Sequence, residues 1–431
     1  MTRHHLLRCA APALGLCLLG GFVALYLREG PLYYLLLRWL GFGPFPYPFL
    51  DGQSVLAAIE CWHHGIDVYV SDPCDVLGRL HVYSPLWLRL PVIPMAWTAP
   101  LGLLLAGAFF LSLALLPPPR RGWDLAATLL AAASPAAAYA VERANIDLIM
   151  FLLAMAAGVL ALRRWPARLP SYLVILLAGF LKFYPLAALV LSLRDRPRIF
   201  LAVNAAAFAA VVAFLAGFHG ELKAMAPNIP NGSYYTDFFG ATNLPHGIAA
   251  LIVPRLPAGS TLAALVSGYL PIGLGALLIV LVIGRVVQGA AEPELRRLTA
   301  GLSEPEAVFL IIGAAIIGGC FFAGQSVAYR GIFLLFVLPA LLTLRRAAER
   351  PGDRRLLASA CIGVVLLTWE GCFRHAIYAL APDAVARCWW LARELLWWYV
   401  VGFLAALSCC TMQKWETIRQ LRLGMPAVMP R

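Results

Sequence analysis

The sequence predicts an all-α polytopic membrane protein, and three observations support this fold class. Hydrophobic residues make up 61% of the 431 residues, and the mean hydropathy is +0.79. Charged residues make up only 13%, about half of the share found in soluble domains. Apolar runs long enough to cross a bilayer, which takes about 20 residues, alternate with short polar connectors. We therefore expect a single integral membrane domain over residues 1–431.

Ten apolar runs are expected to cross the membrane. They lie at 7–27, 90–116, 124–141, 146–162, 199–217, 261–284, 306–323, 332–344, 356–370 and 389–411. The first run follows a basic start but lacks a convincing cleavage site, so we interpret it as an uncleaved anchor with Arg3 and Arg8 inside.

Arginine-rich connectors set the expected topology. They lie at 117–122, 163–168, 194–198, 285–297 and 345–355 and in the tail that follows Lys414. The positive-inside rule places them, both termini and the 412–431 tail in the cytoplasm, as ten crossings require. The net charge of +12 thus reflects topology and not nucleic-acid binding. Abundant Ala, Arg, Leu and Pro are typical of a GC-rich bacterial genome, which predicts a location in the bacterial inner membrane.

Residues 170–193 are expected to form a re-entrant hairpin. Arginine clusters flank about 25 mostly apolar residues, whereas two crossings would need roughly 40. Lys182 and Pro185 lie at the midpoint, where the helix should break. Irregular backbone at that depth is tolerated only against protein or a water-filled cavity, so the hairpin should present Lys182 to a cavity. The alternative is a single crossing beside a misassigned arginine cluster.

Two stretches are expected outside the membrane. The first, 28–89, is dense in titratable groups, which is unusual at a membrane edge. The second, 218–260, is rich in Pro, Gly, Asn, Tyr and Phe, a composition typical of a partly ordered loop over a site. External ends of other runs carry further polar residues, and we expect these groups to converge: Glu142, Asn145, Asp147, Asp237, Asn243, His246, Tyr329 and Arg330.

Several of these residues have a structural interpretation. Arg143 and Asp147 are spaced i, i+4, which favours an ion pair on one helix. Asp72 and Asp75 flank Pro73 as in a turn, and His63 and His64 precede Gly65 as at a helix end. Further structural roles are an interfacial belt at 389–399 and a capping or snorkelling Glu142, although ligand binding by Glu142 stays equally open. Asp51 has no evident local partner, so we favour a functional role for it.

The ten cysteines show no metal-binding spacing. In the external segments, Cys61 could bridge to Cys74, and Cys372 could bridge to Cys388. Spacing alone leaves both disulfides open.

An ordered series of short motifs resembles the GT-C glycosyltransferases and, more narrowly, glycosyltransferase family 87. The series consists of Asp51 with the helix-like SVLAAIECW, Gly65–Asp67–Tyr69, Tyr83–Ser84–Pro85–Leu86, Glu142–Arg143–Asn145–Asp147 and Lys182–Phe183–Tyr184–Pro185. The resemblance extends to about residue 345. It implies a GT-C-like bundle of about ten transmembrane helices, with the re-entrant hairpin and an external catalytic first loop.

The resemblance also implies an activity: transfer of a mannose-like hexose or a pentose from a polyprenyl-phosphate donor to a lipid or glycan acceptor, with inversion, on the external face. Asp51 would be the catalytic base. The expected phosphate and substrate contacts are Lys182, Arg330, Arg79, His81, Tyr83, Glu142, Asn145, Tyr184, Asp237 and His246. No cofactor or metal is expected, although Asp51 with Glu142 could hold a divalent ion. The expected partners are the two substrates and membrane lipids, and the protein should be a monomer.

Three other function classes stay open. A transporter or lipid-linked-saccharide flippase would place polar groups near the midplane in paired broken helices, of which we find one. An O-antigen-type ligase or polymerase would act on diphosphate-linked saccharides. A purely structural membrane protein would have no use for so many ionisable groups at helix ends.

Overall fold

A computed structural model describes residues 3–43, 45–120 and 122–423 of the chain. Residues 1–2, 44, 121 and 424–431 lie outside the described residues, including the last part of the 412–431 tail predicted to be cytoplasmic. The α-helices are α1 (Arg3–Arg28), α2 (Gly30–Trp39), α3 (Leu50–His63), α4 (Thr98–Ser112), α5 (Gly122–Ala132), α6 (Pro135–Glu142), α7 (Ile146–Ala161), α8 (Leu169–Leu181), α9 (Pro197–Gly217), α10 (His219–Met225), α11 (Asn243–Ile252), α12 (Thr261–Ala291), α13 (Pro293–Ala300), α14 (Glu304–Ala323), α15 (Leu338–Ala347), α16 (Pro351–Thr368), α17 (Glu370–Leu380), α18 (Asp383–Met412) and α19 (Glu416–Leu423).

Short 3₁₀ helices and one small sheet complete the fold. The 3₁₀ helices are η1 (Pro85–Arg89), η2 (Met95–Trp97), η3 (Leu113–Leu115), η4 (Tyr184–Arg194), η5 (Ala226–Asn228), η6 (Val253–Arg255) and η7 (Ala328–Leu335). The two strands, β1 (Phe238–Phe239) and β2 (Ser326–Val327), pair antiparallel. Both predicted external stretches thus contain helices of their own.

The helices confirm an all-α polytopic membrane protein. Within the described residues, seven helical segments are long and apolar enough to cross a membrane, or nine if two bent helix pairs each count as one span. The bent pairs are η7 with α15, at 52°, and α16 with α17, at 66°. Every predicted apolar run coincides with one of these segments or with α7, which has only 16 residues. The number of ten crossings stays a prediction.

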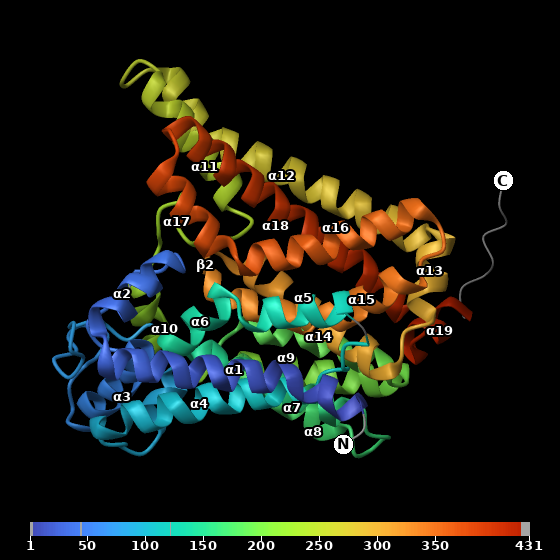
Figure 1. Ribbon diagram of the computed structural model, residues 1–431, viewed down its shortest axis with the longest axis horizontal. Helices are drawn as coiled ribbons and strands as arrows, with labels where there is room; N and C mark the ends of the chain where they lie inside the picture. The colour runs from blue at the N-terminus through green and yellow to red at the C-terminus, as the bar shows by residue number, and fades with distance from the viewer. Residues whose placement is uncertain (1–2, 44, 121, 424–431) are drawn as a thin grey trace.

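The elements divide between two ends of the bundle (Figure 1). The start of α1 lies at the same end as α13, α15 and α19, whereas α2, α3, α10 and α17 lie at the opposite end. The first end carries the arginine-rich connectors 285–297 and 345–355 and the second carries both predicted external stretches. The first and last helices, α1 and α19, thus have ends on the same side of the bundle, as the predicted topology requires. Which side is cytoplasmic stays a prediction.

Helix α14 forms the centre of the core. Ser303 and Glu306 make a reciprocal capping box at its start, and Pro305 occupies the first turn, where a missing N–H costs nothing. Its apolar side chains are buried against η4, η7, α7 and α18. Phe309 stacks with Phe336, which in turn stacks with Phe151 of α7 at 4.3 Å. This packing holds α7 and η7, which both carry site residues, in fixed positions.

The predicted hairpin is present as two short helices that break at Lys182. Helix α8 ends at Leu181, Lys182 is extended, and η4 begins at Tyr184 with Pro185 in its first turn. A side chain at Gly179 would collide with Leu186, so the two helices lie in close contact. Their 13 and 11 residues are each too few to cross a bilayer. Whether the pair re-enters the membrane from the cytoplasmic side stays a prediction.

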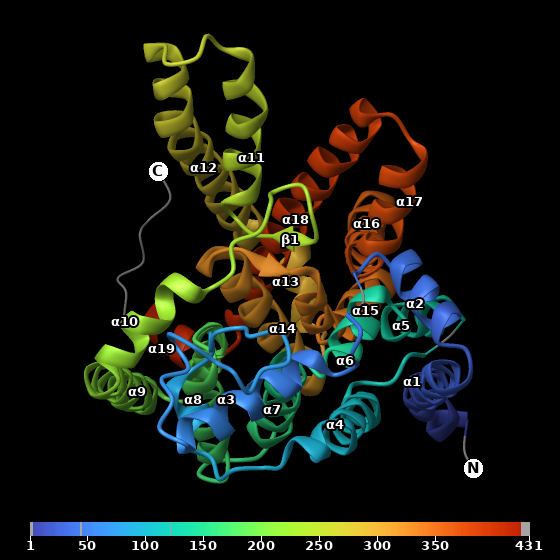
Figure 2. The same cartoon turned by 90° about the vertical axis from the view of Figure 1, so that its left-hand side faces the viewer.

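The part of the second external stretch around β1 rests between two helical arms. Figure 2 shows α11 with α12 as one arm and α17 with α18 as the other, with β1 between them. Arg393 of α18 anchors this stretch by donating hydrogen bonds to the backbone carbonyls of Thr236 and Phe238. The same guanidinium pairs with Glu370 at 2.9 Å and Glu394 at 2.5 Å. Because its side chain is only 3% exposed, this network is a buried one.

Replacing Arg393 by alanine should destabilise the protein and free the second external stretch. The substitution leaves Glu370 and Glu394 buried without their shared cation, which costs about 3–5 kcal/mol. We expect a lower melting temperature and faster proteolysis between residues 229 and 242. Arg387→Ala, an exposed arginine on the same helix, is the control. Equal behaviour of the two variants would contradict the anchoring role.

Candidate functional site

The site is built where the start of α3 meets the junction between α6 and α7. The backbone N–H groups of Asp51 and Gly52 donate to the Arg143 carbonyl at 3.0 and 3.2 Å. Phe49 (φ 61°) and Ala144 (φ 42°) flank this contact and are the non-glycine residues with positive φ among those the structure describes. Such conformations cost energy and persist only where the surrounding structure imposes them. The backbone therefore holds Asp51 in a constrained position.

Asp51 is held by two side chains and stays partly accessible. One carboxylate oxygen accepts a hydrogen bond from Asn145 Nδ2 at 2.6 Å, and the other accepts from Arg79 at 3.3 Å. Its side chain is 17% exposed. Arg79 also donates to the Leu50 carbonyl at 2.7 Å and to Asp75 at 2.9 Å. Both partners come from outside the helix of Asp51, so its local sequence did not reveal them.

Asp147 binds two cations inside the protein. Its fully buried carboxylate contacts Lys182 Nζ at 2.6 Å and Arg330 Nε at 3.1 Å, and it accepts a hydrogen bond from the Tyr184 hydroxyl. Lys182 comes from the break of the hairpin and Arg330 from η7. Asn145 joins this group to Asp51, because its side-chain oxygen caps α7 by accepting the Asp147 N–H at 2.9 Å.

The predicted ion pair between Arg143 and Asp147 is wrong. The i, i+4 rule needs one continuous helix, but α6 ends at Glu142 and α7 begins at Ile146. Arg143 instead pairs with Glu142 at 3.1 Å and donates to the Gly43 carbonyl at 2.8 Å. Asp147 therefore forms its ion pairs with Lys182 and Arg330.

Tyr83 lies close enough to Asp51 and Asp147 to feel the charge of both. Its ring centre is 5.3 Å from Lys182 Nζ. Burial raises the pKa of Tyr83 well above its usual range, and the negative charges of Asp51 and Asp147 raise it further. Tyr83 is therefore neutral, and its hydroxyl is near two groups of side chains. The outer group consists of Asp51, Asn145 and Arg79, and the inner group consists of Asp147, Lys182 and Arg330.

The inner group carries one excess positive charge. Lys182 and Arg330 together balance the single charge of Asp147 and leave a surplus of one. In the outer group, Arg79 is shared between Asp51 and Asp75. The positive surplus is thus buried beside a partly exposed carboxylate, an arrangement suited to a monoanion that reacts next to a base.

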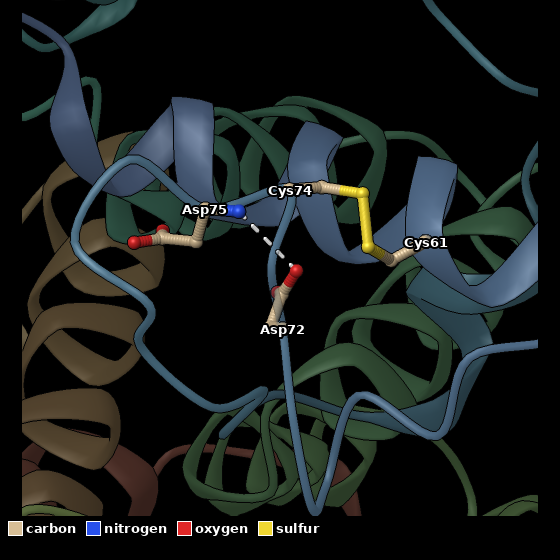
Figure 3. Close-up of a disulfide and its surroundings, with 4 residues drawn as sticks. All are labelled: Cys61, Asp72, Cys74 and Asp75. Atoms are coloured by element: carbon tan, nitrogen blue, oxygen red, sulfur yellow. Dashed lines mark hydrogen bonds between the residues drawn. A yellow bond between two sulfur atoms is a disulfide. The ribbon is translucent and has the colours of Figure 1, made fainter.

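A disulfide fixes the segment that presents Arg79. Cys61 of α3 is bonded to Cys74, with Cα atoms 5.9 Å apart, whereas Cys372 and Cys388 are free thiols. Figure 3 shows the Asp75 carboxylate pointing away from this disulfide, and the Asp75 N–H donates to Asp72. Burial raises the pKa of Asp75, but the hydrogen bonds from Arg79 and from the Leu77 N–H, together with the charge of Arg79, outweigh burial and lower that pKa. The predicted turn at Asp72 and Asp75 is confirmed.

The described residues contain one group of three potential metal ligands close together: Cys61, Asp72 and Cys74. The sulfur atoms of Cys61 and Cys74 are bonded to each other in the disulfide, so neither is a free thiolate ligand. Burial raises the pKa of Asp72 to about 6, and one of its oxygens accepts no hydrogen bond. The alternative divalent site would consist of Asp51 and Glu142. Asp51 contacts Arg79 and Asn145. Glu142 has Arg143 as its charge partner, so each carboxylate already lies beside a cation.

The remaining expected contacts lie outside this group. His81 is buried between the rings of Tyr69 and Tyr83, and burial lowers its pKa to about 4. It is therefore neutral and does not supply the expected cation. Asp237 lines a small cavity with Tyr139. His246 is exposed and stacks on Tyr234.

The sequence analysis assigned Asp75 to a turn alone, and it expected Asp147 to converge with the other polar groups but favoured an ion pair with Arg143 for it. Asp147 lies at the start of a strongly apolar run, and an ionisable residue in such a run is a functional signal by itself. Asp75 gave no signal, because its role depends on how the first external stretch folds.

No protein-family model, curated protein or solved structure matches this chain. The geometry of the site is therefore the basis for a functional proposal.

His81 should make the protein less stable in acid. Its folded pKa of about 4 lies below the ordinary value of 6.5, so its contribution is complete above pH 6.5 and is lost as the pH falls toward 4. At pH 5 the loss amounts to about 2 kcal/mol. We expect His81→Gln to narrow the difference in melting temperature between pH 8 and pH 5 by a few degrees. The exposed control His64→Gln should leave it unchanged, and a wild-type difference retained in His81→Gln would refute this assignment.

Proposed function

We propose that this protein is a membrane glycosyltransferase that uses a polyprenyl-phosphate-linked sugar, of the kind found in the GT-C group. One observation carries the proposal: a buried cationic pair with one surplus charge, Lys182 and Arg330, lies beside a constrained and accessible carboxylate, Asp51. The proposed acceptor is a lipid or glycan hydroxyl and the sugar is mannose-like. The proposed location is the external face of the bacterial inner membrane.

Asp51 acts as the general base in the proposed reaction. Its carboxylate accepts the proton of the acceptor hydroxyl as that oxygen bonds to the anomeric carbon. The bond from this carbon to the phosphate oxygen breaks at the same time, and polyprenyl phosphate leaves with its electron pair. Because attack and departure occur on opposite faces, the anomeric configuration inverts. Asn145 and Arg79 hold the carboxylate in position for this transfer.

Lys182 and Arg330 stabilise the leaving group. The donor is a phosphodiester with one negative charge, and departure increases the charge on its phosphate. Fixed cations in a buried site stabilise such charge without reorganising. Tyr83, whose ring lies against Lys182, is a further donor. A diphosphate-linked substrate of a ligase or polymerase carries more negative charge than this one surplus balances, which favours the monophosphate.

The position of the cluster favours transfer over transport. Asp51 lies at the start of α3, at the end of the bundle where α2, α3, α10 and α17 gather (Figure 1). A flippase would need polar groups along a path between the two ends. A base at one end of the bundle is instead suited to chemistry at one membrane surface.

Asp51→Asn should abolish transfer while the protein still folds. The amide keeps the size of the side chain but cannot accept the proton, and loss of a general base costs about 10²- to 10⁴-fold in rate. The measurement is transfer of radiolabelled mannose from polyprenyl phosphate to lipids extracted from a strain that lacks the gene. The control is Asp67→Asn, an exposed residue of the same external stretch. Near wild-type transfer by Asp51→Asn would refute the proposed base.

Lys182→Met should remove the surplus charge and retain the fold. Asp147 keeps Arg330 and Tyr184 as partners, so the melting temperature should change little. We expect kcat/KM for the donor to fall by roughly 10²-fold or more, as when one fixed donor to a developing anion is lost. Lys223→Met, an exposed lysine on α10, is the matched control. Equal activity of the two variants would contradict a phosphate-binding role for Lys182.

A further inference from the structure

A cavity of about 750 Å³ lies between α1, α2, α4 and the α5–α6 pair. Its wall is largely apolar, with Phe22 and Leu25 from α1, Leu37 from α2 and Leu103 from α4. The helices α1 and α4 and the α5–α6 pair are among the candidate membrane spans. A cavity between such helices would face hydrocarbon, and its volume lies in the range of ligand sites.

One end of this cavity reaches the proposed active site. Phe49 and Glu142 line it there, and the Phe49 N–H bonds to the Glu142 carbonyl at 2.7 Å. Phe49 lies two residues before Asp51 on the chain. A molecule in the cavity is thus separated from the proposed base by a single turn of backbone.

Glu142 gives this end an uncommon chemistry. Its side chain is only 4% exposed, and neither carboxylate oxygen accepts a hydrogen bond from the described residues. The Nε of Arg143 lies 3.1 Å away as a charge partner, and its guanidinium is stacked over the Phe45 ring at 4.1 Å. A buried carboxylate with free acceptor capacity is costly unless a donor reaches it. A ligand with a hydroxyl group would satisfy it.

We propose that this cavity binds the hydrocarbon chain of a second lipid, whose uncharged, hydroxyl-bearing head group lies at Glu142 and reaches Asp51. This inference rests on the proposed function, because it identifies the acceptor as a lipid alcohol. The polyprenyl-phosphate donor belongs at Lys182 and Arg330, which provide positive charge and do not line this cavity. A phosphate at the cavity end would find no surplus cation, because the charge of Arg143 is already shared with Glu142.

Two neighbouring glycines of α1 allow a matched test. Gly21 lines the cavity, and an added side chain there meets no atom within 4 Å. Gly20 has equally open surroundings but does not line the cavity. Gly21→Phe should therefore place a ring in the cavity, whereas Gly20→Phe adds the same ring elsewhere on the helix.

The experiment compares two photoreactive lipids in phosphatidylcholine nanodiscs. One is a diacylglycerol and the other is the phosphatidic acid with the same chains, and both carry a diazirine and an alkyne on one chain. We expect the diacylglycerol to label peptides of α1 and α4. A ring in the cavity displaces several CH₂ groups of the bound lipid chain. Gly21→Phe should therefore reduce this labelling roughly tenfold, while Gly20→Phe should not. Phosphatidic acid should label less, and Glu142→Gln should narrow the difference between the two lipids.

Two outcomes would overturn the inference. Equal labelling in the two glycine variants would mean that ordinary bilayer lipid occupies this surface. Preferred labelling by phosphatidic acid would assign the cavity to a phosphorylated lipid. The binding assay requires no turnover, so it is also run on Asp51→Asn. Labelling retained without any Asp51-dependent transfer would refute the proposed function alone, whereas Asp51-dependent transfer without cavity labelling would refute the lipid site alone.

Discussion

The buried carboxylate of Asp147 is the interaction on which the rest of the site depends. A fully buried charge without partners is strongly unfavourable, so the fold must bring cations to it. Lys182 lies at the break of a hairpin. Arg330 lies on a 3₁₀ helix, 183 residues after Asp147 in the sequence. The single carboxylate therefore fixes α7, the hairpin and η7 relative to one another. It also explains why the hairpin breaks where it does, since a continuous helix would carry Lys182 elsewhere.

Asn145 connects this buried charge to the surface. Its side chain accepts from the Asp147 backbone and donates to the Asp51 carboxylate. One amide therefore caps α7 and orients the proposed base, so the position of Asp51 depends on the position of Asp147. From the other side, the disulfide and Asp75 hold Arg79 against Asp51. The base is thus constrained from two parts of the chain that are distant in sequence.

The sequence predicted the helical class, the positions of the spans and the break at Lys182, because these depend on local hydropathy and on proline. It also singled out Asp51, Lys182 and Arg330. It failed at Asp147, where spacing indicated a pair with Arg143. The i, i+4 rule assumes that the helix continues, and the cap at Asn145 interrupts it. The role of Arg79 through Asp75 and the neutral state of His81 depend on burial, which only the folded chain defines.

Inversion at carbon places a geometric demand on an enzyme whose two substrates are both lipids. The attacking oxygen and the leaving oxygen must lie on opposite faces of the anomeric carbon, so the two head groups approach it from opposite directions. Each lipid also needs its own contact with hydrocarbon, because its chain stays in the membrane. A cationic group outside the cavity and an apolar cavity that reaches Glu142 would meet both demands of the proposed reaction. The charges of these two places would then sort the lipids, since only the cationic group has a surplus charge for a phosphate. In the proposed arrangement, the fold itself holds Asp51 near both places before either lipid binds.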